Sequence, residues 1–292
     1  MQADPPTAIV SEIMNEHSIT VNGVTLCTET FGDPGNPAVL LIMGATVSML
    51  GWDDRFCRRL AVGGRYVIRY DHRDTGRSDT YEPGKPQYML QDMADDAVGV
   101  LDAHRLAQAH FVGMSLGGMI AQLVAIQYPN RLATLTLIAS SPHGPEDPDL
   151  PPMAEKVQSY FAPSGGVDWS NEASVVDFLA RGAHIMTGSM RAFDETAVRS
   201  LVIREMGRES NYASRGNHAL IASDRWRERL GEIRVPTLVV HGSDDPVLPY
   251  GHGVALAKEI PGATLLTIEG MGHELHPADW DTIVRAILQH TA

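Results

Sequence analysis

Short apolar runs that alternate with helical patterns most strongly constrain what this 292-residue chain can fold into. The runs expected as strands cover 38–43, 66–70, 109–112 and 132–139, and helical patterns separate them at 52–62, 90–104 and 116–128. Mostly apolar runs of this length are typical of strands that are buried on both faces. Ahead of them, Asn22-Gly23 between alternating residues predicts a hairpin. The alternation predicts an α/β fold with a mostly parallel central sheet and helices on both faces.

The alternation is interrupted once, after the strand at 132–139. Residues 142–152 are rich in Pro, Asp and Gly, and the following segment to about residue 229 has helical patches without a strand pattern. Strand patterns then return at 237–241 and 263–268, with helical patterns at 251–259 and 277–290. We therefore expect a core of residues 1–141 and 230–292, interrupted by a helical cap of residues 142–229. Residues 1–16 have little periodicity and are expected to form a loose tail.

Composition excludes several classes of partner. The chain has 23 Lys and Arg against 36 Asp and Glu, a formal net charge of −13, which would repel a nucleic-acid backbone. Its apolar runs are far shorter than the roughly 18 residues needed to cross a membrane. The N-terminus lacks the basic and apolar regions of a signal peptide, so we expect a cytoplasmic protein that binds neither nucleic acid nor membrane.

The cysteines and histidines give little support for a metal site. Cys27 and Cys57 are the only cysteines, which is too few for a disulfide framework or a cysteine-rich zinc site. His273-Glu-Leu-His276 places its histidines three residues apart, and the H-E-x-x-H motif of zinc hydrolases needs four. We expect neither a metal nor an organic cofactor.

The motif Gly113-Met-Ser115-Leu-Gly117 is the main indication of chemistry. It lies where an apolar strand ends and a helix begins, which is the context of a nucleophile elbow. Such a sharp turn needs small neighbours around the serine, and the glycines supply them. Ser115 is therefore the candidate nucleophile, and the alternative is a serine that merely caps an ordinary helix.

A serine nucleophile needs a base and an acid that orients it, and the two late strands offer both. Asp245 follows the first of these strands and His273 follows the second. Because the carboxyl ends of strands in an open α/β sheet line one crevice, these groups can meet Ser115 there. The alternatives are Asp244 for the acid and His276 or His241 for the base. His276 precedes a proline at a helix start, and His241 lies inside a strand end.

An oxyanion hole needs two N–H donors near the nucleophile. Leu116, directly after the serine, is one candidate. The other comes from the loop Met43-Gly44-Ala45-Thr46 after the first inner strand, where Gly44 allows a sharp turn. We predict the N–H groups of Ala45 and Leu116 as the pair.

With these motifs, the chain resembles the α/β-hydrolase family from about residue 19 to 290. It also contains Asp71-His-Arg73-Asp74-Thr-Gly76-Arg77-Ser78, close to the D-x-R-G-x-G-x-S stretch of that family. It is most similar to the aclacinomycin methylesterase-like esterases, which share the Met-Gly loop, the Asp-His-Arg-Asp-Thr-Gly-Arg-Ser stretch and the Gly-Met-Gly-His end. The resemblance implies ester hydrolysis through Ser115, His273 and Asp245, with an acyl-enzyme intermediate.

Two positions depart from the family pattern. Met43-Gly44 stands where most members have His-Gly, so the imidazole that usually braces the oxyanion loop is missing. Asp74 replaces the usual glycine and can change a turn near the site. We interpret Asp71, Arg73 and Arg77 as structural residues that hold loops by ion pairs.

The sequence thus predicts a serine carboxylesterase that acts on small to medium carboxylic esters, a small-molecule substrate class. A lactonase, a C–C bond hydrolase or a cofactor-free perhydrolase would use the same three residues, and a ligand receptor or scaffold is the non-enzymatic alternative. Apolar side chains of the insertion could line the substrate pocket or form the core of the cap: Phe161, Trp169, Phe178, Met186, Met190, Phe193 and Trp226.

Overall fold

The central sheet has eight strands in the order β1-β2-β4-β3-β5-β6-β7-β8 in the computed structural model, which describes residues 16–142, 147–162, 167–209 and 211–292. The strands are β1 (Glu16–Val21), β2 (Val24–Phe31), β3 (Ala38–Ile42), β4 (Tyr66–Tyr70), β5 (Ala109–Met114), β6 (Leu132–Ile138), β7 (Thr237–Gly242) and β8 (Thr264–Ile268). β2 runs antiparallel to both β1 and β4, and every pairing from β4 to β8 is parallel. The predicted mostly parallel sheet is confirmed.

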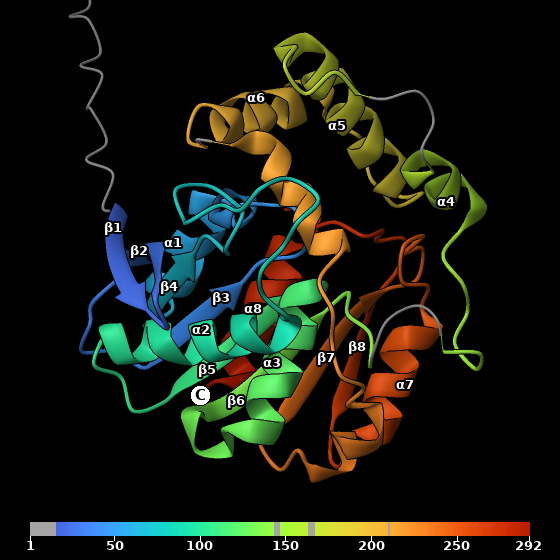
Figure 1. Ribbon diagram of the computed structural model, residues 1–292. Helices are drawn as coiled ribbons and strands as arrows, with labels where there is room; N and C mark the ends of the chain where they lie inside the picture. The colour runs from blue at the N-terminus through green and yellow to red at the C-terminus, as the bar shows by residue number, and fades with distance from the viewer. Residues whose placement is uncertain (1–15, 143–146, 163–166, 210) are drawn as a thin grey trace, which may run out of the picture.

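The hairpin between β1 and β2 forms where the Asn-Gly pair predicts it. Asn22 and Gly23 have φ values of 48° and 77°, and Val21 pairs with Val24 across the turn. A two-residue turn with both φ values positive matches the twist of the flanking strands. This antiparallel ribbon forms one edge of the sheet (Figure 1).

Helices cover both faces of the sheet, as predicted. Neighbouring residues of a strand point to opposite sides, so these apolar strands present an apolar surface on each face. Leu40 and Phe111 belong to an apolar cluster with residues of α2, α3 and α7. Leu41 and Val112, the next residues along the same strands, belong to a second cluster with residues of α1 and α8. The helices are α1 (Asp54–Val62), α2 (Leu90–Ala103), α3 (Leu116–Gln127), α7 (Gly251–Glu259) and α8 (Trp280–His290).

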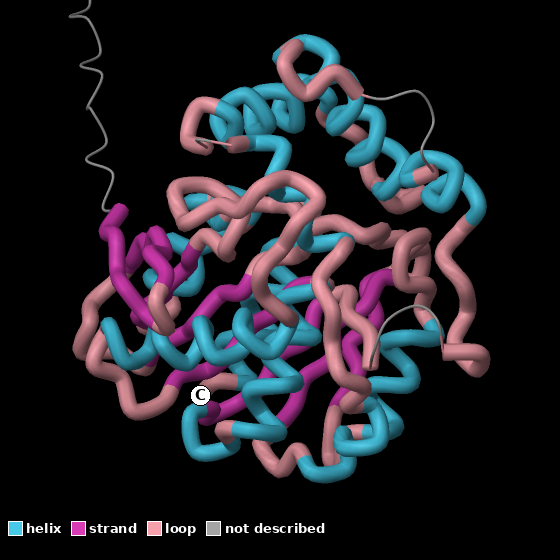
Figure 2. The backbone as a smooth tube through the Cα atoms, viewed as in Figure 1, coloured by secondary structure: helices cyan, strands magenta, loops and turns pink. Residues whose placement is uncertain are grey.

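The chain between β6 and β7 forms a helical insertion. It contains α4 (Glu155–Phe161), α5 (Glu172–Met186), α6 (Glu195–Met206) and the short helices η3 (Tyr212–Ala219) and η4 (Arg227–Glu232). Its described residues include no strand, in line with the sequence pattern (Figure 2). Figure 1 shows α4, α5 and α6 as a layer above the sheet and its covering helices.

The end of the insertion returns to the sheet domain. Trp226 and Leu230 pack in the same apolar cluster as α3, and the indole N–H of Trp226 donates to Gln122 at 3.1 Å. The predicted tail lies almost wholly outside the described residues, since only its last residue, Glu16, is described, as the start of β1. Among the helices of the described chain, none is long and apolar enough to span a membrane.

Candidate active site

Ser115 occupies a sharp turn between β5 and α3. Its φ of 52° and ψ of −119° are strained for a residue with a side chain, and its hydroxyl does not cap the helix. A Cβ atom on Gly113 would lie 2.3 Å from the carbonyl oxygen of Gly117, and one on Gly117 would lie 2.1 Å from that of Ile42. The glycines of the motif are therefore required by close backbone contact, as the elbow pattern indicates.

Ser115, His273 and Asp245 lie in one chain of hydrogen bonds. The Ser115 hydroxyl donates to His273 Nε2 at 3.0 Å, and His273 Nδ1–H donates to Asp245 Oδ2 at 2.8 Å. The three residues follow β5, β8 and β7, respectively, so they meet at the carboxyl edge of the parallel strands. The structure thus brings together the three residues that the sequence singled out.

The carboxylate of Asp245 is held on both oxygens. Its Oδ1 accepts the backbone N–H groups of Val247 at 2.9 Å and Leu248 at 2.8 Å, which leaves Oδ2 for His273. Burial on its own would raise the pKa of Asp245, but the charge and hydrogen bond of His273 and the Leu248 N–H hold that pKa below its usual range. Asp245 is therefore a charged, fixed acceptor for one nitrogen of the imidazole.

The alternative residues have other contacts. Asp244 accepts hydrogen bonds from the hydroxyl and the N–H of Ser189 in the insertion. His276 caps η5 (Pro277–Asp279) by accepting the N–H of Ala278 at 3.1 Å, as its position before a proline suggested. His241 is fully buried and donates to the carbonyl of Leu248 at 2.7 Å, with its Nε2 3.6 Å from Asp245.

The loop after β3 passes directly beside Ser115. A Cβ atom on Gly44 would lie 3.3 Å from Ser115 Cβ, a tight contact that shows how closely the loop passes the serine. The next residue is Ala45, and Leu116 is the first residue of α3. Neither of their N–H groups donates a hydrogen bond to another described residue. Both predicted donors therefore lie in segments that adjoin the serine, with no competing acceptor among the described groups.

Comparison with known proteins identifies the family to which this fold belongs. A model of the α/β hydrolase fold family matches residues 37–278. This chain belongs to the α/β hydrolase family. Rhodomycin D methylesterase DauP from Streptomyces sp. strain C5 is 34% identical, over 95% of this chain and 98% of its own. Rhodomycin D methylesterase DnrP from Streptomyces peucetius is 33% identical over the same shares.

Solved structures place the chain in the same fold. A meta-cleavage product hydrolase from Pseudomonas fluorescens IP01 superposes with a TM-score of 0.74, at 22% identity, over 94% of this chain and 96% of that one. At that identity the likeness concerns the fold. The predicted family and the α/β-hydrolase fold are thus confirmed, and the relatives named as methylesterases support the predicted ester hydrolase.

The carboxylate of Asp74, the residue that departs from the usual α/β hydrolase pattern, is held by several hydrogen bonds. Asp74 has a φ of 65°, in the left-handed region where a glycine is normally favoured. Its buried carboxylate accepts hydrogen bonds from the Tyr81 N–H at 2.6 Å, the Tyr88 hydroxyl at 2.8 Å and the Asn217 amide at 2.9 Å. These bonds offset the cost of the left-handed conformation and tie the turn to the insertion.

The charged residues of the same stretch form ion pairs, which supports their interpretation as structural. Asp71 pairs with Arg208 of the insertion at 2.8 Å. Arg73 pairs with Asp96 at 2.6 Å, and Arg77 pairs with Glu16 at 2.6 Å.

Side chains that hold the loop after β3 are what the sequence reasoning missed. This loop, residues 43–49, contains the predicted oxyanion donor Ala45 and is called the oxyanion loop below. His72 Nε2 lies 2.9 Å from the carbonyl of Met43, and His218 Nδ1 lies 2.9 Å from the N–H of Thr46. The only sequence signal was indirect: the family histidine is absent at Met43, so another group had to hold this loop. No local motif marks His218, because it lies 172 residues from Thr46 in the chain.

Most aromatic residues of the insertion contact one another. Phe178 stacks on Tyr160 with ring centroids 4.6 Å apart, and Trp169 lies edge-on to Phe178 at 6.2 Å. Trp226 is 3% exposed and packs in the core beside α3, so it belongs to the core and not to a substrate pocket. Met186 contacts the site through its backbone, since its carbonyl accepts the N–H of His273 at 2.9 Å.

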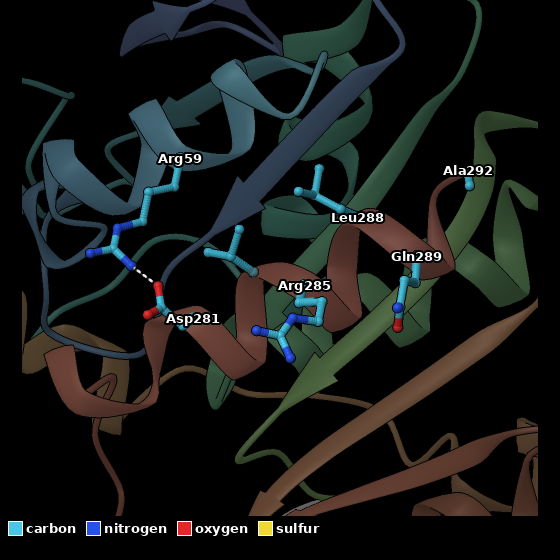
Figure 3. A pocket seen from close by; sticks show the side chains of 7 residues that line it. Arg59, Asp281, Arg285, Leu288, Gln289 and Ala292 are labelled. Carbon is cyan, nitrogen blue, oxygen red and sulfur yellow. Dashed lines mark hydrogen bonds and ion pairs between the residues drawn. The ribbon is translucent and has the colours of Figure 1, made fainter.

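A surface pocket between α1 and α8 is separate from this site (Figure 3). It is lined by Arg59, Asp281, Val284, Arg285, Leu288, Gln289 and Ala292. None of these residues belongs to the Ser115 group, and an ion pair between Arg59 and Asp281 lies at its rim. Across the described ranges, no group of three His, Cys, Asp or Glu side chains is arranged to hold a metal ion.

Proposed function

We propose that this α/β hydrolase is a serine carboxylesterase and that its substrate is a carboxylic methyl ester. The observation that carries the proposal is the hydrogen-bonded chain from Ser115 through His273 to Asp245. The substrate class is supported by the two rhodomycin D methylesterases, each similar over nearly its whole length. The helical insertion, with its carbonyl of Met186 on His273, would act as a cap over the substrate.

In the first half of the reaction, Ser115 Oγ attacks the ester carbonyl carbon. His273 Nε2 takes the hydroxyl proton as the new C–O bond forms. Asp245, already charged and bonded to Nδ1, stabilises the imidazolium and keeps its orientation. The carbonyl oxygen, now negatively charged, accepts the N–H groups of Ala45 and Leu116. The tetrahedral intermediate then collapses: the carbonyl double bond re-forms, the bond from carbon to the methoxy oxygen breaks, and the imidazolium gives its proton to that oxygen. Methanol departs, and the acyl group stays bound to Ser115 Oγ.

In the second half, water takes the place of the alcohol. His273 removes a proton from the water, whose oxygen attacks the acyl carbon and forms a second tetrahedral oxyanion. Collapse of this intermediate breaks the bond to Ser115 Oγ, which regains its proton from the imidazolium. The products are a carboxylic acid and the free enzyme, and no step requires a metal or organic cofactor.

A lactonase, a C–C bond hydrolase or a perhydrolase would use the same three residues, so a comparison of substrates is the deciding experiment. Purified enzyme should release methanol from rhodomycin D or simple methyl esters and hydrolyse a p-nitrophenyl acyl series, with EDTA present throughout. A panel of lactones and a vinylogous diketone, the latter a substrate for C–C bond hydrolysis, are tested as alternative substrates. Turnover of either alternative without turnover of any ester would reject the carboxylesterase assignment. Absence of all turnover, together with unreactive Ser115, would favour a ligand receptor.

A further inference from the structure

Side chains hold the oxyanion loop at several points along its length. They are His72 on the Met43 carbonyl at 2.9 Å, His218 on the Thr46 N–H at 2.9 Å, Glu205 on the N–H and hydroxyl of Ser48 at 2.9 and 2.7 Å, and Asp71 on the Met49 N–H at 2.8 Å. Glu205 and His218 belong to the helical insertion. The insertion therefore contacts the loop that adjoins the serine, as well as His273.

His218 is fixed at both ring nitrogens. Its Nε2–H donates to the carbonyl of Arg73 at 2.8 Å, so its Nδ1 carries the lone pair that accepts the Thr46 N–H. The side chain is buried, and its ring packs edge-on to His72 with centroids 5.9 Å apart. Burial and the neighbouring His72 lower the pKa of His218 to about 3. The ring is therefore neutral near pH 7, as an acceptor at Nδ1 must be.

Thr46 is the residue of this loop whose backbone most needs support. Its φ is 65°, a backbone conformation that is strained for a β-branched residue. The Thr46 N–H and the Ala45 carbonyl belong to the same peptide group, and that group is planar. A bond that fixes this N–H therefore fixes the plane on one side of Ala45 and limits where the Ala45 N–H can point.

We propose that His218 is a positioning residue that sets the oxyanion hole through Thr46. The proposal rests on the proposed function, because it assumes that the Ala45 N–H binds the oxyanion. His218 and His72 together provide the bracing that the histidine missing at Met43 would otherwise give. Asn217, the preceding residue, donates a hydrogen bond to Asp74. Adjacent residues of η3 therefore contact the two places where the chain departs from the family pattern, the loop after Met43 and Asp74.

Two substitutions, each of which keeps one of the two hydrogen bonds of His218, separate this positioning role from a general tie, in which His218 only holds the insertion on the core. An asparagine amide oxygen lies close to the position of a histidine Nδ1, and a glutamine amide nitrogen lies close to that of Nε2. His218→Asn therefore keeps the acceptor for Thr46 and loses the donor to Arg73. His218→Gln keeps the donor to Arg73 and loses the acceptor for Thr46. A general tie predicts similar losses for both variants.

The experiment measures kcat and KM on a methyl ester and the rate of Ser115 labelling by a fluorophosphonate, whose P=O oxygen occupies the oxyanion position. We expect His218→Gln to lower kcat and the labelling rate about 10- to 100-fold with little change in KM. His218→Asn should stay within about threefold of the parent enzyme, well below the cost of losing one oxyanion donor. Equal losses in the two variants, or normal labelling of His218→Gln, would overturn the proposal.

A suppressor variant provides a second test of the link from His218 to Thr46. Thr46→Gly removes the cost of the positive φ, so it should restore part of the labelling rate in the His218→Gln chain. If both single variants fail to fold by circular dichroism, His218 is a determinant of the fold and the positioning role is rejected. Labelling also needs no ester turnover. A parent enzyme that labels but hydrolyses no ester would refute the proposed function and still allow the positioning role to be measured.

Discussion

The two loops that adjoin Ser115 are held in place by different kinds of contact. Around His273 the backbones pack directly against one another: the His273 N–H donates to the carbonyl of Met186, and the Asp244 N–H donates to that of Met271 at 3.1 Å. Side chains of Ser243 and Glu274 add contacts to the N–H groups of Gly270 and Gly188. A Cβ atom on Gly188 would lie 2.1 Å from the carbonyl oxygen of Gly270, so this backbone packing is very close. The oxyanion loop is held instead by buried side chains, two of them imidazoles.

This difference indicates which changes each loop tolerates. Where backbones pack this closely, a loop depends on small residues that allow the chains to approach. A loop held by side chains depends on the identity and protonation of each of them. We therefore expect glycine substitutions to affect the His273 loop, and substitutions or protonation of histidine to affect the oxyanion loop.

The largest effect should come from removing the nucleophile that both loops serve. Ser115→Ala leaves no hydroxyl to attack the ester, so kcat should fall by about 10⁴-fold or more. The folded state should persist, because alanine fills the same space at the elbow. The measurement is initial-rate kinetics beside thermal unfolding. Residual turnover within tenfold of the parent would reject Ser115 as the nucleophile, and neither loop would then have a catalytic role.

The second prediction concerns the acid beside the His273 loop. Asp245→Asn presents an amide where the imidazole Nδ1–H needs an acceptor, so kcat should fall by about 10³- to 10⁴-fold. Asp244→Asn, the matched control one residue away, should cost less than about tenfold, because Asp244 contacts Ser189 at the surface. Parallel kcat measurements on the two variants decide the assignment. The reverse ranking would transfer the role to Asp244.

The third prediction tests the backbone packing of the His273 loop. Gly188→Ala forces a methyl group against Gly270 and Gly272, so the loop must shift, and kcat should fall by about 10- to 100-fold. The control is Gly216→Ala, also in the insertion, where a Cβ atom meets nothing within 4 Å. Kinetics and melting temperature of both variants give the comparison. Unchanged kcat in Gly188→Ala would mean that close packing at this point does not set the position of His273.

The smallest effect is a pH dependence of stability at the oxyanion loop. The pKa of His218 is about 3 in the folded protein and about 6.5 in an unfolded chain, so the unfolded state binds more protons between these values. The stability contributed by neutral His218 is complete above about pH 6.5 and is lost as the pH falls toward 3, by at most about 1.4 kcal/mol per pH unit.

Denaturant unfolding at several pH values from 7.5 to 4.5 measures this contribution. His218→Asn lacks the titrating group, so the stability of the parent protein should fall more steeply on acidification than that of the variant. Parallel curves for the two proteins would show that His218 is not kept neutral by the fold. His17→Asn, at an exposed histidine of β1, serves as the control.

Most of the fold followed from local patterns. The Asn22-Gly23 hairpin, the continuous apolar strands and the elbow glycines each reflect a physical requirement of a few neighbouring residues. The choice of Asp245 and His273 followed from their places after late strands, because strand ends in such a sheet share one edge. The helix at 52–62 begins two residues later than its pattern suggests, because Asp53 caps it.

What sequence could determine, then, was the set of elements, the family and the three residues now found in one hydrogen-bonded chain. Tertiary structure decided how the loop beside them is held. His218 and Glu205 reach it from an insertion that has no motif, and they lie 172 and 157 residues away in the chain from Thr46 and Ser48, which they contact. Local periodicity contains no information about such contacts, since they depend on how the insertion packs on the sheet domain. The buried N–H and C=O groups of a loop need hydrogen-bond partners, and these are the side chains that the packing brings near.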